Sequence, residues 1–203
     1  MSKPSLFYVY DPMCSWCWGY RRTWQLLQEN LAPVLPISTM VGGLAEDSDL
    51  PMPAAMQTFL QQTWHKISSE LGAKFNFDFW SQCQPKRSTY PSCRAVIFAR
   101  KYQKEQVMCL AIQEAYYLQA KNPSEISTLT EIAISIGLNA DLFAQQINSE
   151  ELKQQLAEEI IMARQMPIQG FPSLVLAVNG EFFPIPLDYK NWRTSYDVIL
   201  AKL

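Results

Sequence analysis

The sequence predicts an α/β fold in which both ends of the chain build one sheet, with a helical segment inserted between them. Residues 5–43 read as strand, helix and strand, and residues 173–202 read as two strands and a helix. The residues between these units show helical spacing of apolar side chains. Because two or three strands alone cannot make a stable sheet, we expect the two ends to pair. We place a discontinuous sheet domain at residues 1–44 and 166–203, and an all-helical insertion domain at residues 45–165.

Apolar runs and the residues that break them define the N-terminal unit. Leu6–Tyr10 is short, aromatic and β-branched, which predicts a buried strand that ends at Asp11-Pro12. Residues 20–29 carry apolar side chains at helical spacing. Val34–Val41 predicts a second strand, with Pro36 making its first part irregular. This order is that of a parallel crossover unit.

The C-terminal unit has the pattern of a hairpin followed by a helix. Ser173–Val178 predicts a strong strand, and Asn179-Gly180 is typical of a type I′ turn. We expect Pro184 and Pro186 to end the return strand. A helix should cover residues 188–202, with Asp188 as its N-cap.

The insertion is predicted to be a series of helices, because its apolar side chains recur every three to four residues. Residues 75–80 alternate aromatic and polar side chains, which fits either a short strand or an aromatic loop packed on the core. The helices are expected over residues 54–71, 91–102, 105–120, 124–136, 141–147 and 149–164.

The segment Asp11–Gly19 carries the clearest chemical signal, a Cys-x-x-Cys pair at the seam between the first strand and its helix. Cys14 should lie at a helix N-terminus, where unpaired N–H groups and the helix dipole favour a thiolate. Only the thiolate attacks disulfides. Cys17, one turn further along, can resolve the mixed disulfide. The pair therefore predicts thiol–disulfide exchange.

The cysteines allow two other interpretations, a zinc site and a purely structural pair. A zinc site usually needs four ligands, but Cys83, Cys93 and Cys109 have no second short spacing and His65 is the one histidine of the chain. We therefore predict no metal site. The pair could also be two buried cysteines that behave as small hydrophobic residues, and this is the expected state of the other three.

The composition and the lengths of the apolar segments argue against a nucleic-acid-binding or membrane-spanning protein. The chain has 203 residues, 48% of them hydrophobic, and a net charge of −2 with no basic block, so we expect no nucleic-acid partner. No segment reaches the length of a membrane span. The first apolar run is too short for a signal peptide, so we expect a cytoplasmic protein, where a Cys-x-x-Cys is more often catalytic than structural. The oligomeric state stays open.

Gly170-Phe171-Pro172-Ser173 is the second candidate element, just before the strong C-terminal strand. It could form a loop against the cysteine pair, with the Phe171 backbone free to pair with an extended peptide. The residues alone favour an ordinary trans proline at the start of a strand.

Taken together, the Cys14–Cys17 motif, the helical insertion and Gly170–Pro172 resemble the DsbA-like branch of the thioredoxin superfamily. Asp11–Gly19 is similar to its cytosolic FrnE-like members, the predicted protein-disulfide isomerases. The resemblance implies a thioredoxin-like fold with a large inserted all-helical domain. It also implies that Cys14 attacks, Cys17 resolves and Pro172 is a cis proline beside them. We further predict that the substrate contacts Met13, Ser15, Trp16, Trp18 and Phe171.

Two positions differ from the family pattern. Many relatives carry a buried carboxylate where this chain has Tyr8, and the nearest acid is Asp11, which we expect to cap the turn. Strongly oxidising members have a histidine where this chain has Trp16. Trp16 brings no positive charge to a Cys14 thiolate, so we expect a more reducing potential.

The leading functional hypothesis is a thiol–disulfide oxidoreductase or protein-disulfide isomerase that acts on protein or small-molecule disulfides. It needs no bound cofactor, and glutathione is a candidate co-substrate. The alternative is a glutathione-dependent enzyme similar to the kappa-class transferases or 2-hydroxychromene-2-carboxylate isomerase. These typically have serine at the position of Cys14 and lack Cys17. A binding module for unfolded chains is the third hypothesis, because Trp16 and its neighbours could form an apolar patch.

Overall fold

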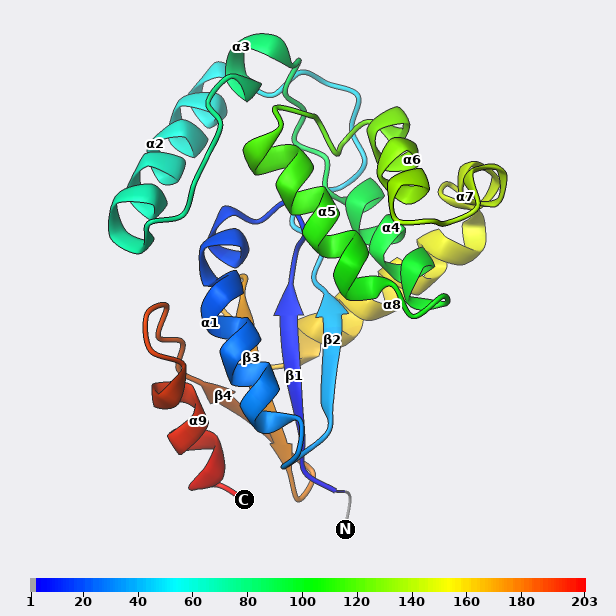
Figure 1. Cartoon of the computed structure of the whole chain (residues 1–203). Helices are drawn as coiled ribbons and strands as arrows, with labels where there is room; N and C mark the ends of the chain where they lie inside the picture. The colour runs from blue at the N-terminus through cyan, green and yellow to red at the C-terminus, as the bar shows by residue number, and fades with distance from the viewer. Residues whose placement is uncertain (1–2) are drawn as a thin grey trace.

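The computed structural model describes residues 3–203 and contains a four-stranded mixed sheet in the order β2-β1-β3-β4. β1 (Ser5–Tyr10) pairs in parallel with β2 (Ile37–Val41) and antiparallel with β3 (Ser173–Val178), which pairs with β4 (Glu181–Ile185). The two ends of the chain therefore share one sheet, as the sequence predicts. Figure 1 shows this sheet below a group of helices that belongs to the middle of the chain.

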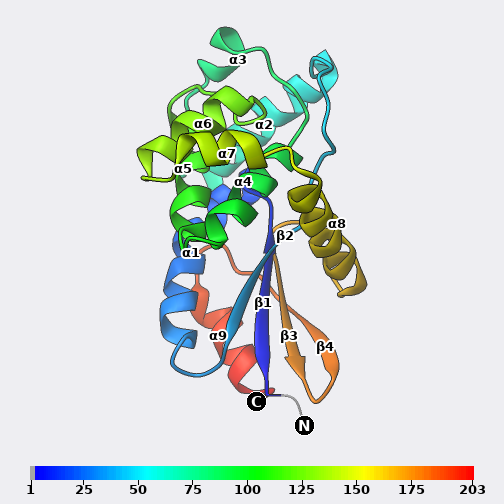
Figure 2. The ribbon, with the colours of Figure 1, turned by 90° about the vertical axis from the view of Figure 1, so that its right-hand side faces the viewer.

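Helices α1 (Ser15–Leu31) and α9 (Trp192–Leu200) contact each other and pack on one face of the sheet (Figure 2). The alternation of β1 places Leu6 and Tyr8 toward α1, where they are buried with Leu27. The inward-facing side chains of β1, which alternate along the strand, thus pack against the apolar face of α1 in one core. This packing fixes the start of α1, and with it Cys14, above the end of β1.

Helix α8 (Glu150–Gln165) covers the other face of the sheet near β2 (Figure 2). Its Ala163 packs with Val9 and Val175 in a second buried cluster. The Glu159 carboxylate accepts the Val41 N–H at 2.9 Å, so α8 is also tied to the end of β2. Ile161, which the helical spacing places inward, is 57% exposed on the outer side of α8.

Helices α2 to α7 of the insertion lie beyond the C-terminal ends of β1 and β2 (Figure 1), whereas α8, the last helix of residues 45–165, packs on the sheet. Residues 75–78 form a loop whose Phe75 and Phe77 pack around the fully buried Trp64, which favours the second of the two interpretations of this segment. The helices are α2 (Ala54–Leu71), α3 (Phe79–Gln82), α4 (Tyr90–Arg100), α5 (Glu105–Leu118), α6 (Ile126–Ser135) and α7 (Ala140–Gln146).

The C-terminal hairpin confirms one prediction and corrects two. Asn179 and Gly180 have φ angles of 55° and 85°, the positive values that a type I′ turn requires. Strand β4 continues through Pro184 because it is an edge strand, where a residue without an N–H is tolerated, and it ends at Ile185, directly before Pro186. Asn191, not Asp188, caps α9, whereas the Asp188 carboxylate accepts N–H groups in the turn before it.

Candidate active site

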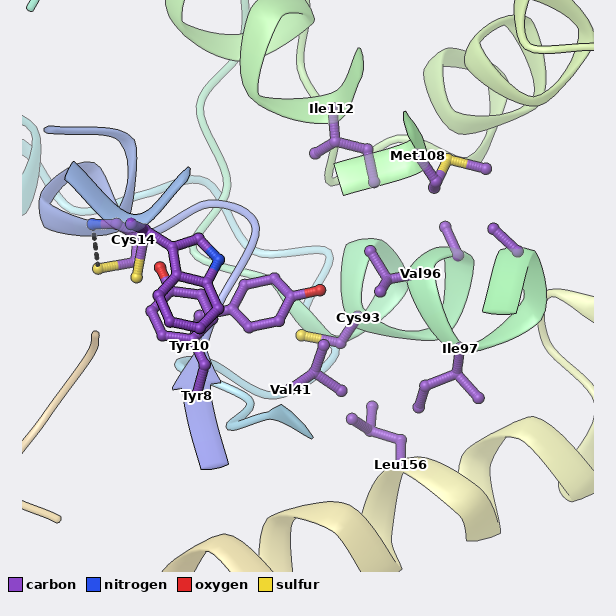
Figure 3. Packing of buried hydrophobic residues seen from close by; sticks show 14 of the residues in the cluster. Tyr8, Tyr10, Cys14, Val41, Cys93, Val96, Ile97, Met108, Ile112 and Leu156 are labelled. Carbon is purple, nitrogen blue, oxygen red and sulfur yellow. Dashed lines mark hydrogen bonds between the residues drawn. The ribbon is translucent and has the colours of Figure 1, made fainter. Parts of the chain in front are cut away.

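The site is built around the first turn of α1. Cys14 is the N-cap residue of this helix, and its Sγ accepts the Cys17 N–H at 3.4 Å (Figure 3). The Asp11 carbonyl oxygen accepts the Cys14 N–H at 3.0 Å and closes the turn. The Cys17 N–H in the first turn of α1 therefore points toward the sulfur of Cys14, which lies at the positive end of the helix dipole.

Cys17 lies deeper in the protein than Cys14. Cys14 is 7% exposed, whereas Cys17 is 1% exposed. Burial raises the pKa of the Cys17 thiol well above its ordinary value, and the adjacent Cys14 raises it further. Cys17 therefore stays a thiol at neutral pH. This difference suits an outer cysteine that attacks and an inner cysteine that acts later.

The loop before β3 contacts the outer cysteine. The Phe171–Pro172 peptide bond is cis, as the family resemblance implies. The Cys14 thiol donates a hydrogen bond to the Phe171 carbonyl oxygen at 3.3 Å. The Phe171 ring also packs over the backbone of Gly42, just after β2. Two segments that lie 157 residues apart in the chain thus form one side of the site.

Gly42 is required for this close approach. A Cβ added there would lie 2.0 Å from Cε1 of Phe171, so Gly42→Ala must push the ring away. We expect Gly42→Ala to lower the free energy of unfolding by about 1–3 kcal/mol. We also expect it to lose exchange activity, because the Phe171 carbonyl moves away from Cys14. Denaturant titration and a disulfide-reduction assay measure the two effects.

Gly170 provides a matched control in the same loop. A Cβ there meets nothing within 4 Å, so Gly170→Ala should keep wild-type stability and activity. Equal behaviour of Gly42→Ala and Gly170→Ala would contradict the proposed packing of Phe171.

The insertion holds the cysteine loop through aromatic side chains. The Trp64 indole N–H donates to the Ser15 hydroxyl at 3.1 Å, and the Tyr117 hydroxyl donates to the Met13 carbonyl at 2.7 Å. The Trp18 indole N–H donates to the Lys74 carbonyl at 3.0 Å. These bonds come from residues that are wholly or nearly buried, so the helical domain fixes the conformation of the motif from one side.

Asp11 is fully buried beneath the loop and binds four donors. Its carboxylate accepts the Met13 N–H at 2.8 Å, the Leu44 N–H at 2.7 Å and the Thr89 hydroxyl at 2.6 Å. The Cys93 thiol lies at 3.5 Å from the same carboxylate. Burial raises the pKa of Asp11, while these hydrogen bonds oppose the shift. Whereas Cys14 is the N-cap of α1, Asp11 caps the turn before the helix through the Met13 N–H, as expected. It joins the loop to the segments around residues 44 and 89.

A cavity of about 220 Å³ opens beside Cys14, and we refer to it as the Cys14 cavity. Of the predicted substrate contacts, Met13, Ser15, Trp16 and Phe171 line it. Trp18 does not, because its ring is buried against Tyr117. The remaining lining residues are Leu44, Met52, Phe59, Leu60, Thr63, Lys86, Arg87, Thr89 and Tyr116.

Most of these further residues were not predicted from the sequence, because they come from the insertion. Phe59 and Leu60 carry a signal, because both lie on the apolar face that the sequence predicts for residues 54–71, and Phe59 is 60% exposed in the structure. Lys86 and Arg87 lie in a loop between α3 and α4 and match no motif. Their position beside Cys14 arises only from the tertiary fold.

The other three cysteines and His65 do not line the Cys14 cavity. All five cysteines are free thiols, and burial raises the pKa of Cys109 to about 12. The Cys83 thiol donates to the Ala120 carbonyl oxygen at 2.9 Å. His65 stacks on Phe77, with ring centroids 4.2 Å apart. Within residues 3–203, no group of three or more potential ligands is arranged to hold a metal ion.

The sequence model of the family described as "Thioredoxin" matches residues 7–181 of the chain. The chain belongs to the thioredoxin family. Its fold places it in the DsbA-like branch, in which helices are inserted into the thioredoxin sheet. Over the described part of the chain, no helix is both long enough and apolar enough to cross a bilayer.

Solved structures cover nearly the whole chain. A predicted protein disulfide isomerase from Nitrosomonas europaea is similar with a TM-score of 0.84 and 27% identity, covering 99% of each chain. The cytosolic disulfide reductase DsbM from Pseudomonas aeruginosa is similar with a TM-score of 0.78 and 22% identity, covering 98% of this chain and 100% of that one. DsbM has also been solved with GSH.

A curated relative is longer than this chain. The ClpXP adapter protein SpxH of Bacillus subtilis is 23% identical over 203 residues. The aligned region is 97% of this chain but only 65% of SpxH. The chain thus spans less than two thirds of the length of this relative.

Proposed function

We propose that the protein is a cytosolic thiol–disulfide oxidoreductase that works through Cys14 and Cys17. The observation that carries the proposal is the position of Cys14. Its sulfur lies at the N-terminus of α1, contacts the Phe171 carbonyl and lines a cavity, while Cys17 is buried one turn behind it. This is the geometry that stepwise disulfide exchange requires.

The reaction proceeds in two exchanges. The Cys14 thiolate attacks one sulfur of the substrate disulfide, and the other sulfur leaves as a thiolate that takes a proton from water. Cys17 then loses its proton and attacks Cys14, which releases the second substrate thiol. Two electrons pass from the cysteine pair to the substrate. The raised pKa of Cys17 favours attack by Cys14 first and by Cys17 second, because Cys17 is a thiol, and not the nucleophilic thiolate, when the substrate arrives.

Reduction is the proposed direction, with a thiol such as glutathione as the electron donor. Trp16 brings no charge of its own to the site. Its ring packs edge-on with Tyr189, and the Lys66 ammonium lies 5.6 Å from the ring centroid. The name of DsbM, a cytosolic disulfide reductase, and its structure with GSH support this direction. The presence of both cysteines favours exchange over a glutathione-dependent isomerase or transferase.

The reduction potential of the Cys14–Cys17 pair in glutathione buffers tests the proposed direction. We expect a value at or below the cytosolic glutathione poise of about −220 to −320 mV. A potential near that of the periplasmic oxidant, about −120 mV, would show that the protein is an oxidant. An accompanying assay of insulin reduction with glutathione should give turnover.

A further inference from the structure

The Cys14 cavity has an uneven distribution of charge. Lys86 and Arg87 line it, and among its described lining residues there is no aspartate or glutamate. The chain as a whole carries a net charge of −2. Lys86 and Arg87 thus form a cationic wall of the cavity that also holds the attacking sulfur. In a protein with a net negative charge, such a wall favours binding of a negatively charged group.

The two cations differ in how they are held. The Lys86 ammonium pairs with Glu125 at 2.9 Å and Asp49 at 3.3 Å, so its charge is already balanced. No carboxylate of residues 3–203 lies within 4.0 Å of the Arg87 guanidinium. Within the described part of the chain, its side chain makes one hydrogen bond, from Nη1 to the Met56 Sδ at 3.5 Å. Arg87 is therefore the cation of this wall that has donors left for a ligand.

The rest of the cavity suits the body of a small organic disulfide. Met13, Trp16, Leu60 and Phe171 give it apolar walls. Its volume of about 220 Å³ accommodates a small molecule or a few atoms of an extended chain, not a folded surface. A guanidinium binds a carboxylate through two parallel hydrogen bonds, which fixes orientation as well as charge.

We propose that Arg87 is a specificity-determining residue that binds the carboxylate of a small anionic disulfide or thiol while Cys14 attacks its sulfur. This inference rests on the proposed exchange reaction and names the substrate class of the same site. The substrate disulfide is reduced to two thiols and the Cys14–Cys17 pair is oxidised. Two thiol groups of a donor that differs from the released thiol then reduce the pair again and are oxidised to a disulfide.

The test compares two disulfides that differ in charge. Glutathione disulfide carries carboxylates, whereas 2-hydroxyethyl disulfide is neutral. With dithiothreitol as the electron donor for both disulfides, kcat/KM is measured for the wild type, Arg87→Gln and Arg87→Lys. We expect Arg87→Gln to lower kcat/KM for glutathione disulfide by about tenfold or more, as for the loss of a charge-assisted hydrogen bond. The neutral disulfide should change less than about twofold, and Arg87→Lys should recover part of the loss.

Arg22→Gln is the matched control, because Arg22 is an exposed arginine on α1 without an ion pair in the described chain, and it does not line the Cys14 cavity. It should leave both rates unchanged. Equal losses for both disulfides, or the same loss in Arg22→Gln, would overturn the role of Arg87. Failure of the wild type to reduce the neutral disulfide would instead overturn the proposed function.

Salt gives a second readout that needs no variant. Raising the ionic strength of the wild type from about 0.01 to 0.5 M should lower kcat/KM for glutathione disulfide and leave the neutral disulfide unchanged, since screening weakens exposed charge pairs. An equal response of the two disulfides would also count against the proposal.

Discussion

Replacing Cys14 by serine should abolish disulfide reduction completely. A serine hydroxyl stays protonated at neutral pH and cannot form the mixed disulfide, while Cys17 is buried and its raised pKa keeps it a thiol. The fold should be unaffected, because serine is smaller and can still accept the Cys17 N–H as an N-cap. Insulin reduction and 2-hydroxyethyl disulfide turnover measure the loss.

Cys83→Ser is the control for this variant. Cys83 is half-buried, bonds only the Ala120 carbonyl and does not line the Cys14 cavity. Its replacement should change turnover by less than about twofold. Retention of activity in Cys14→Ser would favour a binding module or an enzyme in which the cysteine pair has no chemical role.

The second large effect is expected for Asp11→Ala. The change leaves the Met13 and Leu44 N–H groups and the Thr89 hydroxyl without their buried acceptor. We expect the free energy of unfolding to fall by roughly 3 kcal/mol. Each unpaired buried donor costs about 1–3 kcal/mol, and rearrangement of the surrounding structure recovers part of the total. Urea denaturation measures it. Asp197→Ala, an exposed acid on α9, is the control and should stay within about 0.5 kcal/mol of wild type.

The same residue predicts a pH dependence. The pKa of Asp11 is raised in the folded protein, so between its unfolded value near 3.8 and its folded value the folded state binds more protons. The stability contributed by protonated Asp11 is therefore present at low pH and is lost as the pH rises through this window. The stability difference between wild type and Asp11→Ala should shrink over the same interval. A constant difference would show that Asp11 has an unperturbed pKa.

Local sequence was enough to predict the part of the site that carries the chemistry. A strand, a break and a helix follow each other within residues 5–31, and that order places Cys14 at the helix N-terminus. The hairpin at Asn179-Gly180 is predictable for the same reason, because two adjacent residues determine the turn. Pairing of the two chain ends followed from the need to complete the sheet.

Long-range contacts could not be predicted in this way. Asp11 binds Leu44, Thr89 and Cys93, which lie 33 to 82 residues away, and no pattern along the chain links them. The family's buried carboxylate is missing at Tyr8, but the structure buries a carboxylate at Asp11 instead. Arg87 belongs to the site only because the insertion folds over Cys14.

Trapping the mixed disulfide tests the central claim most directly. Cys17→Ser should react with a substrate disulfide and stop at the first exchange, since the second nucleophile is missing. Mass spectrometry of the digested protein should then find one substrate thiol on Cys14 and none on Cys83, Cys93 or Cys109. An adduct on one of these three cysteines, or no adduct at all, would contradict the assignment of Cys14 as the attacking residue.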